Sequence, residues 1–357
     1  MVDSWRTLQE LGPFGSDAFP WMAQETEALR ATLARWCGVP PQRLALTENV
    51  TSGCVLPLWG LPFQPGERLL LSDAEHPGVV AAITELARRQ GLAIDRFPVQ
   101  RARTGAAVLE ALEEHLQPGT RLVALSHLLW NTGLPMPIDA VADRLSSHPL
   151  QPWLLVDAAQ AMGSLALGAV PDRADIYAFT GHKWCCGPEG LGGVVLSQRL
   201  LDAGSPTLIG WRSLSDEGQG SSPWQPDARR FEVATSCLPL GAGLRASLAE
   251  LELCGTDLER EALIGQRSRR LWEGLCAHPA LEPLLQEAPP ASGLVSFTAP
   301  GHDPQQLVRA LARRGLHLRV LADPPCLRAC THVVTTDEEI DTLLTQLNDL
   351  LATGQNT

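Results

Sequence analysis

Residues 154–193 decide the fold and read LLVDAAQAMGSLALGAVPDRADIYAFTGHKWCCGPEGLGG. One apolar run ends at Asp157, and a second leads into Thr180-Gly181-His182-Lys183. Short apolar runs of this kind are typical of buried strands in a parallel sheet. Ligands of open parallel sheets bind beyond the carboxyl ends of the strands, so we expect Asp157 and Lys183 to converge on one crevice.

Short apolar runs alternate with helical patterns on both sides of this stretch. This alternation predicts an α/β fold with a mostly parallel sheet and helices on both faces. Strands are predicted at residues 43–46, 68–71, 92–97, 121–126, 153–157, 174–178 and 193–196. Helices are predicted at residues 22–37, 49–59, 78–90, 106–116 and 138–147.

The pattern changes after a long helix that is predicted at residues 238–254. A few strands with helices to one side then predict a smaller α+β domain. Its helices are expected at 257–277, 304–314 and 337–352, and its strands at 293–298, 316–320 and 332–334. We therefore expect a large domain at residues 1–252, with an N-terminal segment at 1–21, and a small domain at 253–357. The polar stretch 213–222 is expected to form an exposed loop.

Composition restricts the partners and the compartment. Lys and Arg number 28 against 40 Asp and Glu, and this net charge of −12 argues against nucleic acid or an anionic membrane as partner. No apolar run reaches the ~18–20 residues of a membrane-spanning helix, and the N-terminus does not resemble a signal peptide. The nine cysteines include no Cys-x-x-Cys pair, so we expect no metal site, reduced thiols and a cytoplasmic protein.

A lysine and a carboxylate at one crevice are the groups that pyridoxal phosphate (PLP) requires. The lysine, here Lys183, forms a Schiff base with the cofactor, and the carboxylate, here Asp157, keeps the pyridine nitrogen protonated. Taken alone, an Asp at a strand end is more often a turn or helix cap, and a single Lys is more often a solvated charge. Their combination at this spacing favours the cofactor.

A phosphate site is predicted close by. Val50, Thr51 and Ser52 begin a helix directly after the strand at 43–46, and a helix N-terminus with hydroxyl groups binds phosphate readily. Thr180 and His182 would add side-chain donors.

The pattern Asp157-x-x-Gln160-x-x-Gly163 followed by Thr180-Gly181-His182-Lys183 resembles the class V branch of fold-type I PLP enzymes. That branch includes cysteine desulfurases, selenocysteine lyases and kynureninase-like enzymes. The resemblance extends over residues 22–350 and is greatest to the cystine/cysteine C–S lyases of the branch. It is carried also by TENVTSGCVLPLWGL (47–61), LLLSDAEHPGVV (69–80), LVALSHLLWNTG (122–133) and RFEVATS (230–236).

The resemblance implies further roles at the cofactor. Gln160 and Asn131 would contact the 3-oxygen of the ring. His76 would stack on the ring, although its neighbours also suit a residue in the N-terminal turn of a helix. Thr235 would bind the phosphate of the neighbouring subunit and Trp211 would approach from the same direction, which implies an obligate homodimer; for Trp211, ordinary packing is the alternative.

Two arginines would bind the substrate. Arg328, expected just before the strand at 332–334, matches the arginine that binds the α-carboxylate in the family, and Arg319 lies where the C–S lyases have a second arginine. Two arginines would suit a substrate with two carboxylates, such as cystine, because the guanidinium group binds carboxylates bidentately. A surface position is the alternative for each.

The chain also departs from the family pattern. The Gly-rich N-terminal strand of these lyases is missing, and the chain opens at a helix-like segment. Cys326 and Cys330 lie near the place of the desulfurase nucleophile but not in its sequence context, so we expect neither to be catalytic. Only Cys326 is retained as a candidate for an exposed, reactive thiol.

The expected activity is β-elimination from cystine or cysteine, which gives pyruvate, ammonia and a persulfide or sulfide. One alternative is a cysteine desulfurase that passes sulfur to an enzyme thiol, releases alanine and delivers the sulfur to an acceptor protein. A class V aminotransferase or epimerase is a second alternative. A non-catalytic relative of the fold is a third, which the intact Asp157, His182 and Lys183 argue against.

Overall fold

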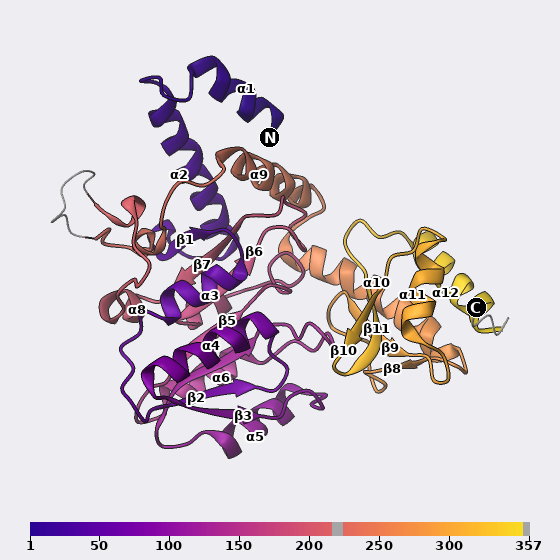
Figure 1. The fold of residues 1–357 in the computed structure, drawn as a ribbon. Helices are drawn as coiled ribbons and strands as arrows, with labels where there is room; N and C mark the ends of the chain where they lie inside the picture. The colour runs from indigo at the N-terminus through magenta and orange to yellow at the C-terminus, as the bar shows by residue number, and fades with distance from the viewer. Residues whose placement is uncertain (216–223, 353–357) are drawn as a thin grey trace.

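The computed structural model describes residues 1–215 and 224–352 and contains two separate β-sheets (Figure 1). The larger sheet has seven strands in the order β1-β7-β6-β5-β4-β2-β3. Strands β2 to β6 pair in parallel, whereas β7 runs antiparallel between β6 and β1. The predicted α/β fold with a mostly parallel sheet is confirmed. The strands are β1 (Leu44–Thr47), β2 (Arg68–Ser72), β3 (Ala93–Phe97), β4 (Thr120–Ser126), β5 (Trp153–Asp157), β6 (Ile176–Thr180) and β7 (Gly192–Leu196).

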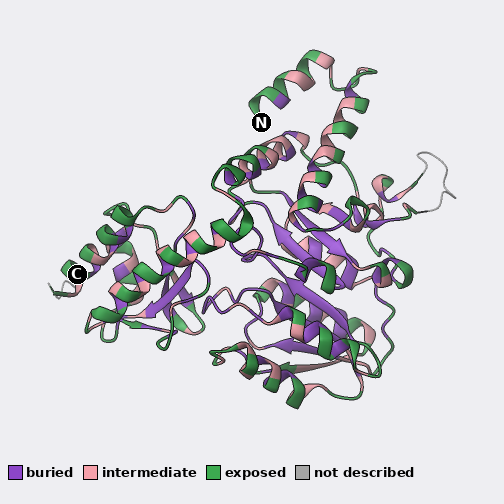
Figure 2. Ribbon diagram, turned by 180° about the vertical axis from the view of Figure 1, so that it is seen from behind, coloured by how far each residue is buried: buried purple, intermediate pink, exposed green. Residues whose placement is uncertain are grey.

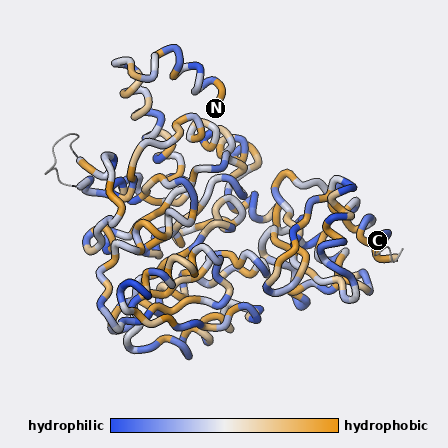
Figure 3. Tube along the Cα trace, in the orientation of Figure 1, coloured by the Kyte–Doolittle hydropathy of each residue, from blue (hydrophilic) through white to orange (hydrophobic). Residues whose placement is uncertain are grey.

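Helices cover both faces of this sheet because its strands send alternate side chains into two apolar cores. One core joins the sheet to α2, α5, α6 and α9, and the other joins it to α3, α4 and α8. Figures 2 and 3 show buried, apolar strands between helices whose outer surfaces are exposed and polar. The helices are α1 (Val2–Leu11), α2 (Ala18–Trp36), α3 (Val50–Leu58), α4 (Pro77–Gln90), α5 (Gly105–His115), α6 (Ile138–Ser146), α7 (Val170–Arg173), α8 (Gln198–Ala203) and α9 (Leu238–Leu253).

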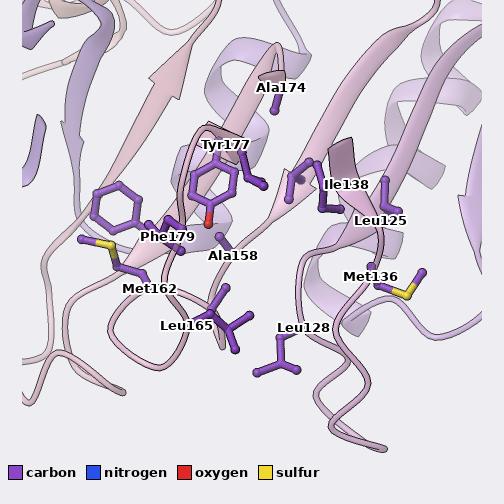
Figure 4. Close-up of a cluster of buried hydrophobic side chains, with 14 of the residues drawn as sticks. Leu125, Leu128, Met136, Ile138, Ala158, Met162, Leu165, Ala174, Tyr177 and Phe179 are labelled. Atoms are coloured by element: carbon purple, nitrogen blue, oxygen red, sulfur yellow. The ribbon is translucent and has the colours of Figure 1, made fainter. Parts of the chain in front are cut away.

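The ends of β5 and β6 pack on a dense apolar cluster (Figure 4). Ala158, Met162 and Phe179 belong to this cluster and are almost completely buried. The hydroxyl of Tyr177 lies 2.9 Å from Nδ1 of His127 within it. Burial lowers the pKa of His127 to about 4, so this ring is neutral. The packed cluster fixes the two strand ends from which Asp157 and the Lys183 segment project.

The smaller sheet has four antiparallel strands in the order β10-β11-β9-β8. Its core is formed with α10, α11 and α12. The elements are β8 (Glu282–Pro283), β9 (Leu294–Thr298), β10 (Arg319–Ala322), β11 (Pro325–Cys330), α10 (Asp257–Ala277), α11 (Pro304–Ala312) and α12 (Asp337–Ala352). The domain boundary at residue 253 stays a prediction; α9 ends at Leu253 and α10 begins at Asp257. Residues 216–222 of the predicted loop at 213–222 lie outside the described residues.

The strand that was predicted at 332–334 is wrong, and the strand predicted at 316–320 overlaps β10 only at its last two residues. The structure instead has a hairpin of β10 and β11, and residues 332–335 form a turn that the bond from Thr335 N–H to the His332 carbonyl closes. Arg328 therefore lies within β11 and not before a later strand. The sequence of β11 contains no continuous apolar run. Leu327 and Ala329 face the core of the small sheet, and Arg328 and Cys330 alternate with them on the opposite face.

The loop after β4 connects the two sheets. The carbonyl of Trp130 accepts a hydrogen bond from Nη1 of Arg328 at 2.5 Å, and the carbonyl of Asn131 accepts one from Oγ of Ser296 at 2.5 Å. Oγ of Ser292 donates to the carbonyl of Gly133 at 3.0 Å. Residues 130–133 thus bind the inner face of the small sheet to the carboxyl edge of the large one.

Residues 1–215 and 224–352 lack two features. None of the helices there is both long and apolar enough to cross a membrane. Within these residues, no three or more His, Cys, Asp or Glu side chains gather where they could hold a metal ion. The nine cysteines are all free thiols.

A buried ion pair joins α2 to the edge of the large sheet. Nη1 and Nη2 of Arg30 both donate to the carboxylate of Glu232, and both side chains are almost completely buried. Nη1 of Arg30 also donates to the carbonyl of Leu44 at 3.0 Å, and the Glu232 carboxylate accepts from the backbone N–H of Leu46 at 2.9 Å. The pair therefore holds β1 between α2 and the segment that leads to Thr235.

We expect Glu232→Ala to destabilise the protein strongly. The variant leaves the buried guanidinium of Arg30 with only the exposed carboxylate of Glu27 as an ionic partner, and breaking a buried pair costs ~3–5 kcal/mol. Urea unfolding followed by circular dichroism should show a much lower midpoint.

The matched control is Glu85→Ala, which removes a carboxylate paired with Arg88 and Arg89 on the exposed surface of α4. Exposed pairs contribute little, so this midpoint should hardly move. An equal decrease of the urea midpoint in the two variants would show that the buried pair contributes no more to stability than the exposed one.

Candidate active site

Asp157 and Lys183 lie at the carboxyl edge of the large sheet, as expected. Asp157 is the last residue of β5 and is 4% exposed, and its Oδ1 accepts a hydrogen bond from the N–H of Ala159 at 2.9 Å. Burial raises the pKa of Asp157, and the Ala159 N–H and the charges of Lys183 and His76 oppose that rise. Burial lowers the pKa of Lys183, against the attraction of Asp157. The structure thus brings this lysine and this carboxylate into one electrostatic site.

His76 contributes to the same site from the start of α4. Its Nδ1 accepts a hydrogen bond from the N–H of Gly78 at 3.2 Å, which confirms the placement in a helix N-terminal turn. The ring is exposed and meets Trp130 edge-on, with centroids 6.1 Å apart. The helix cap fixes the ring, so both roles considered for His76 are compatible.

The predicted phosphate site is assembled from α3, β6 and β7. Asn49 caps α3 by accepting a hydrogen bond from the N–H of Ser52 at 2.9 Å, so Val50, Thr51 and Ser52 form the first helical turn. Oγ1 of Thr180 lies 2.8 Å from Nδ1 of His182. A Cβ at Gly192 would lie 3.3 Å from Cα of Thr180 and 3.4 Å from the carbonyl carbon of Asn49. The N-terminus of α3 and the Thr180–His182 pair are therefore direct neighbours.

Gln160 and Asn131 differ in how many of their side-chain hydrogen-bonding groups already have a partner. Oε1 of Gln160 accepts a hydrogen bond from Nε1 of Trp184 at 2.8 Å, which leaves its amide nitrogen as a donor. Oδ1 of Asn131 accepts from the N–H of Thr132 at 2.9 Å, and its Nδ2 donates to the carbonyl of Asp323 at 3.3 Å. Asn131 therefore holds the β10–β11 turn in this structure, whereas Gln160 retains a donor for a ligand.

Arg319 and Arg328 lie directly opposite each other in the β10–β11 hairpin. Arg319 is exposed, whereas Arg328 is 7% exposed. Nε of Arg328 is shielded from solvent and has no hydrogen-bond partner among the residues that the structure describes. The charges of both arginines lower the pKa of Lys183, so they face the same site. Like charges directly opposite in a sheet are unfavourable, and an anionic ligand would relieve this repulsion.

The two cysteine thiols of β11 differ in their exposure to solvent. Cys326 is completely buried, and burial raises its pKa to about 11. The choice of Cys326 as the candidate for an exposed, reactive thiol is therefore wrong. Cys330 is exposed at the end of β11. Desolvation by the surrounding atoms raises the pKa of its thiol, and the positive charges of Arg328, Arg319 and Lys183 oppose that rise.

Trp211 and Thr235 are both exposed in the single chain. Trp211 begins the short helix η2 (Trp211–Ser213) and is 46% exposed, with the guanidinium of Arg212 5.3 Å from the centre of its ring. Thr235 is exposed between η3 (Ala228–Phe231) and α9. Its neighbours line a surface cavity together with Thr47 and Glu48, the residues before the cap of α3. Their reach into a partner subunit stays a prediction.

Glu75 is a site residue that the sequence reasoning missed. It is 6% exposed, and its carboxylate accepts hydrogen bonds from Ser72 at the end of β2 and from Ser126 at the end of β4. The available signal was its position directly before His76. Trp184, which orients Gln160, was missed as well, although it directly follows Lys183.

These groups fit PLP. Asp157 is a buried carboxylate to which, among the described residues, no side chain donates a hydrogen bond, and this suits a protonated ring nitrogen. Lys183 has a lowered pKa, as an amine that reacts with an aldehyde requires. A helix N-terminus with free hydroxyl groups suits the phosphate.

Comparisons with known proteins agree with this fit. The profile of the family described as "Aminotransferase class-V" matches residues 17–343. The isopenicillin N epimerase of Streptomyces clavuligerus is 31% identical over 93% of this chain and 85% of its own. A probable cysteine desulfurase of Pyrococcus abyssi is 26% identical over 92% of this chain and 84% of its own.

Two solved structures of the cystine C–S lyase C-DES are also similar. One is a complex with its reaction product, cysteine persulfide; it is 41% identical, covers 98% of this chain and 92% of its own, and has a TM-score of 0.92. The other is a mutant with glycine covalently linked to the PLP cofactor; it has the same identity and TM-score and covers 98% of this chain and 91% of its own. The chain is thus a PLP-dependent enzyme and belongs to the aminotransferase class-V family.

Proposed function

We propose that this protein is a C–S lyase that cleaves cystine, or cysteine, to pyruvate, ammonia and a persulfide or sulfide. The observation that carries the proposal is the pair Arg319 and Arg328, opposite each other on β10 and β11 and acting on Lys183. The similarity to the cystine C–S lyase C-DES, at 41% identity over nearly the whole chain, supports it. Cystine has two α-carboxylates, one for each arginine.

PLP, when bound, supplies an electron sink for negative charge at the substrate Cα. Lys183 would bind it covalently, and Asp157 would hold the proton on its ring nitrogen. The phosphate would be held by Val50, Thr51 and Ser52 at the start of α3 and by Thr180 and His182. Gln160 would donate to the ring oxygen through its free amide nitrogen, Asn131 would contact the same oxygen, and His76 would lie against the ring.

Lys183 is the base in this proposal. A lysine accepts the Cα proton only when its amine is neutral. Burial lowers the pKa of Lys183, and Arg328 and Arg319 lower it further against the attraction of Asp157. The site therefore favours the neutral amine that the reaction needs.

The arginines orient the substrate. The buried Nε of Arg328 lacks a partner, and a guanidinium group binds a carboxylate through two parallel hydrogen bonds. Because Nη1 of Arg328 is held by the carbonyl of Trp130, the group has a fixed direction. Arg319, which is exposed, would bind the second carboxylate of cystine at the mouth of the site.

An epimerase is the second candidate, because the isopenicillin N epimerase of Streptomyces clavuligerus is 31% identical over 93% of the chain. Removal of a Cα proton by Lys183 would serve either reaction. A lyase then expels the sulfur group from Cβ, and cystine offers a persulfide, which is less basic than a thiolate and leaves more readily. A desulfurase needs an accessible, deprotonated thiol instead; Cys326 is buried, and the pKa of the exposed Cys330 is raised by desolvation.

We also propose that the enzyme is a homodimer, with Thr235 and Trp211 of each subunit reaching the site of the other. Both residues are exposed in the single chain, and the neighbours of Thr235 line a cavity beside the start of α3. Sedimentation equilibrium of the holoenzyme tests this arrangement, and a monomer would contradict it.

Product analysis separates the three activities. We expect cystine to yield pyruvate and ammonia in equal amounts, because elimination leaves an unsaturated amine that hydrolyses. Chromatography and coupled assays measure both products. Alanine as the main product would favour a desulfurase, and inversion at Cα without pyruvate would favour an epimerase. Cys326→Ser and Cys330→Ser should keep forming pyruvate, since elimination needs no enzyme thiol.

Arg328→Lys should lower kcat/KM for cystine by roughly tenfold or more. The lysine keeps the charge but loses the planar fork, and a hydrogen bond to a charged group is worth ~1.5–3 kcal/mol. Steady-state kinetics with cystine and with cysteine measure the effect. Arg319→Lys is the matched control, and it should raise KM for cystine more than for cysteine, which has one carboxylate. Unchanged kinetics in Arg328→Lys would assign the α-carboxylate to Arg319.

A further inference from the structure

Glu75 is a buried carboxyl group between the ends of three neighbouring strands. Its Oε1 accepts hydrogen bonds from Oγ of Ser72 at 2.5 Å and from the N–H of Ser126 at 2.8 Å, and its Oε2 accepts from Oγ of Ser126 at 3.0 Å. Ser72 ends β2, and Ser126 ends β4 and pairs in register with Asp157 at the end of β5. The carboxyl group thus lies beside Asp157 and directly precedes His76.

Glu75 is surrounded by hydrogen-bond donors, but no cationic side chain among the described residues pairs with it. Within residues 1–215 and 224–352, no lysine, arginine or histidine forms an ion pair with it. The titratable groups that face it are Asp157 from β5 and Cys54 from α3, and its own neighbour in sequence is His76. Burial raises the pKa of Glu75 to about 7, with the Ser72 hydrogen bond opposing the rise, the charge of Asp157 adding to it and the Ser126 hydrogen bonds opposing it.

We propose that Glu75 is a positioning residue that acts on the cofactor through Asp157, setting the strength with which the site holds a proton at the ring nitrogen. A negative charge on Glu75 destabilises the charged form of Asp157. A proton bound at the ring nitrogen beside Asp157 would compensate for this repulsion. Ionised Glu75 therefore strengthens the hold of Asp157 on its positive partner, and neutral Glu75 weakens it. The hydrogen bonds to Ser72 and Ser126 also fix the β2–α4 connection that carries His76.

A purely structural role is the alternative. In that case Glu75 would only tie β2 to β4, and its removal would lower stability without changing how the site responds to pH. Glu75→Gln separates the two roles because glutamine has the same size and keeps an acceptor for the N–H of Ser126, but it does not ionise. The inference rests on the PLP site alone and not on the choice of substrate.

The test is a pH titration of the visible absorption of the holoenzyme without substrate, so the outcome does not depend on which reaction the protein catalyses. A positive ring nitrogen beside Asp157 favours ionised Glu75, so the wild-type holoenzyme should show a spectral transition at or below pH 7, and Glu75→Gln should lose it. Glu85→Gln, on the exposed side of the adjacent helix α4, should retain it. The dissociation constant of PLP, measured by equilibrium dialysis at pH 8, should rise in Glu75→Gln alone.

Ser126→Ala provides a second arm should Glu75→Gln fail to fold. This variant keeps the carboxyl group but removes the hydroxyl that donates to Oε2, so it should move the transition to higher pH by about one unit, a tenfold change in proton affinity. A wild-type spectrum without a transition between pH 5 and 8 would overturn the proposal. The same transition in Glu75→Gln as in the wild type, or an unmoved transition in Ser126→Ala, would also overturn it.

Discussion

The burial of the Asp157 carboxylate is the constraint on which the rest of the site depends. A buried charge is costly unless a partner of opposite charge and hydrogen-bond donors compensate it. Asp157 has one backbone donor, at Ala159, and Lys183 lies close enough to act on its charge. The protonated ring nitrogen of PLP, once bound, would supply a positive partner. Cofactor binding would therefore stabilise the same carboxylate whose burial is costly to the protein.

The topology of the large sheet brings the other groups to Asp157. Parallel strands end at the same edge, so β2, β4, β5 and β6 deliver Glu75, Asn131, Asp157 and the Lys183 segment to one place. Close packing is needed for this arrangement. A Cβ at Gly53 would lie 3.0 Å from Cβ of Ala178, so the glycine lets α3 approach β6 and bring its N-terminus to the phosphate site. The small sheet adds Arg319 and Arg328 from the opposite side through the loop at 130–133.

Local sequence predicted the parts of the site that follow from strand ends. Asp157, Lys183 and the first turn of α3 follow apolar runs or helix caps, and the structure has them in those places. Arg328 was placed wrongly because its strand has one polar face, and a search for apolar runs misses such strands. Cys326 was chosen by its distance in sequence from Arg328; it shares a face of β11 with Arg328, and its contact with Ser296 on the neighbouring strand accompanies its complete burial. Glu75 was missed because its partner Ser126 lies 51 residues away.

The central claim, that the carboxylate of Asp157 holds a proton at the ring nitrogen of PLP, is tested most directly by nitrogen NMR. The holoenzyme is reconstituted with PLP that carries ¹⁵N in its ring, and the shift and proton coupling of this nitrogen are recorded at pH 7.5. The account predicts a protonated nitrogen in the wild type and an unprotonated nitrogen in Asp157→Asn. An unprotonated ring nitrogen in the wild type, or a proton that persists in Asp157→Asn, would contradict it.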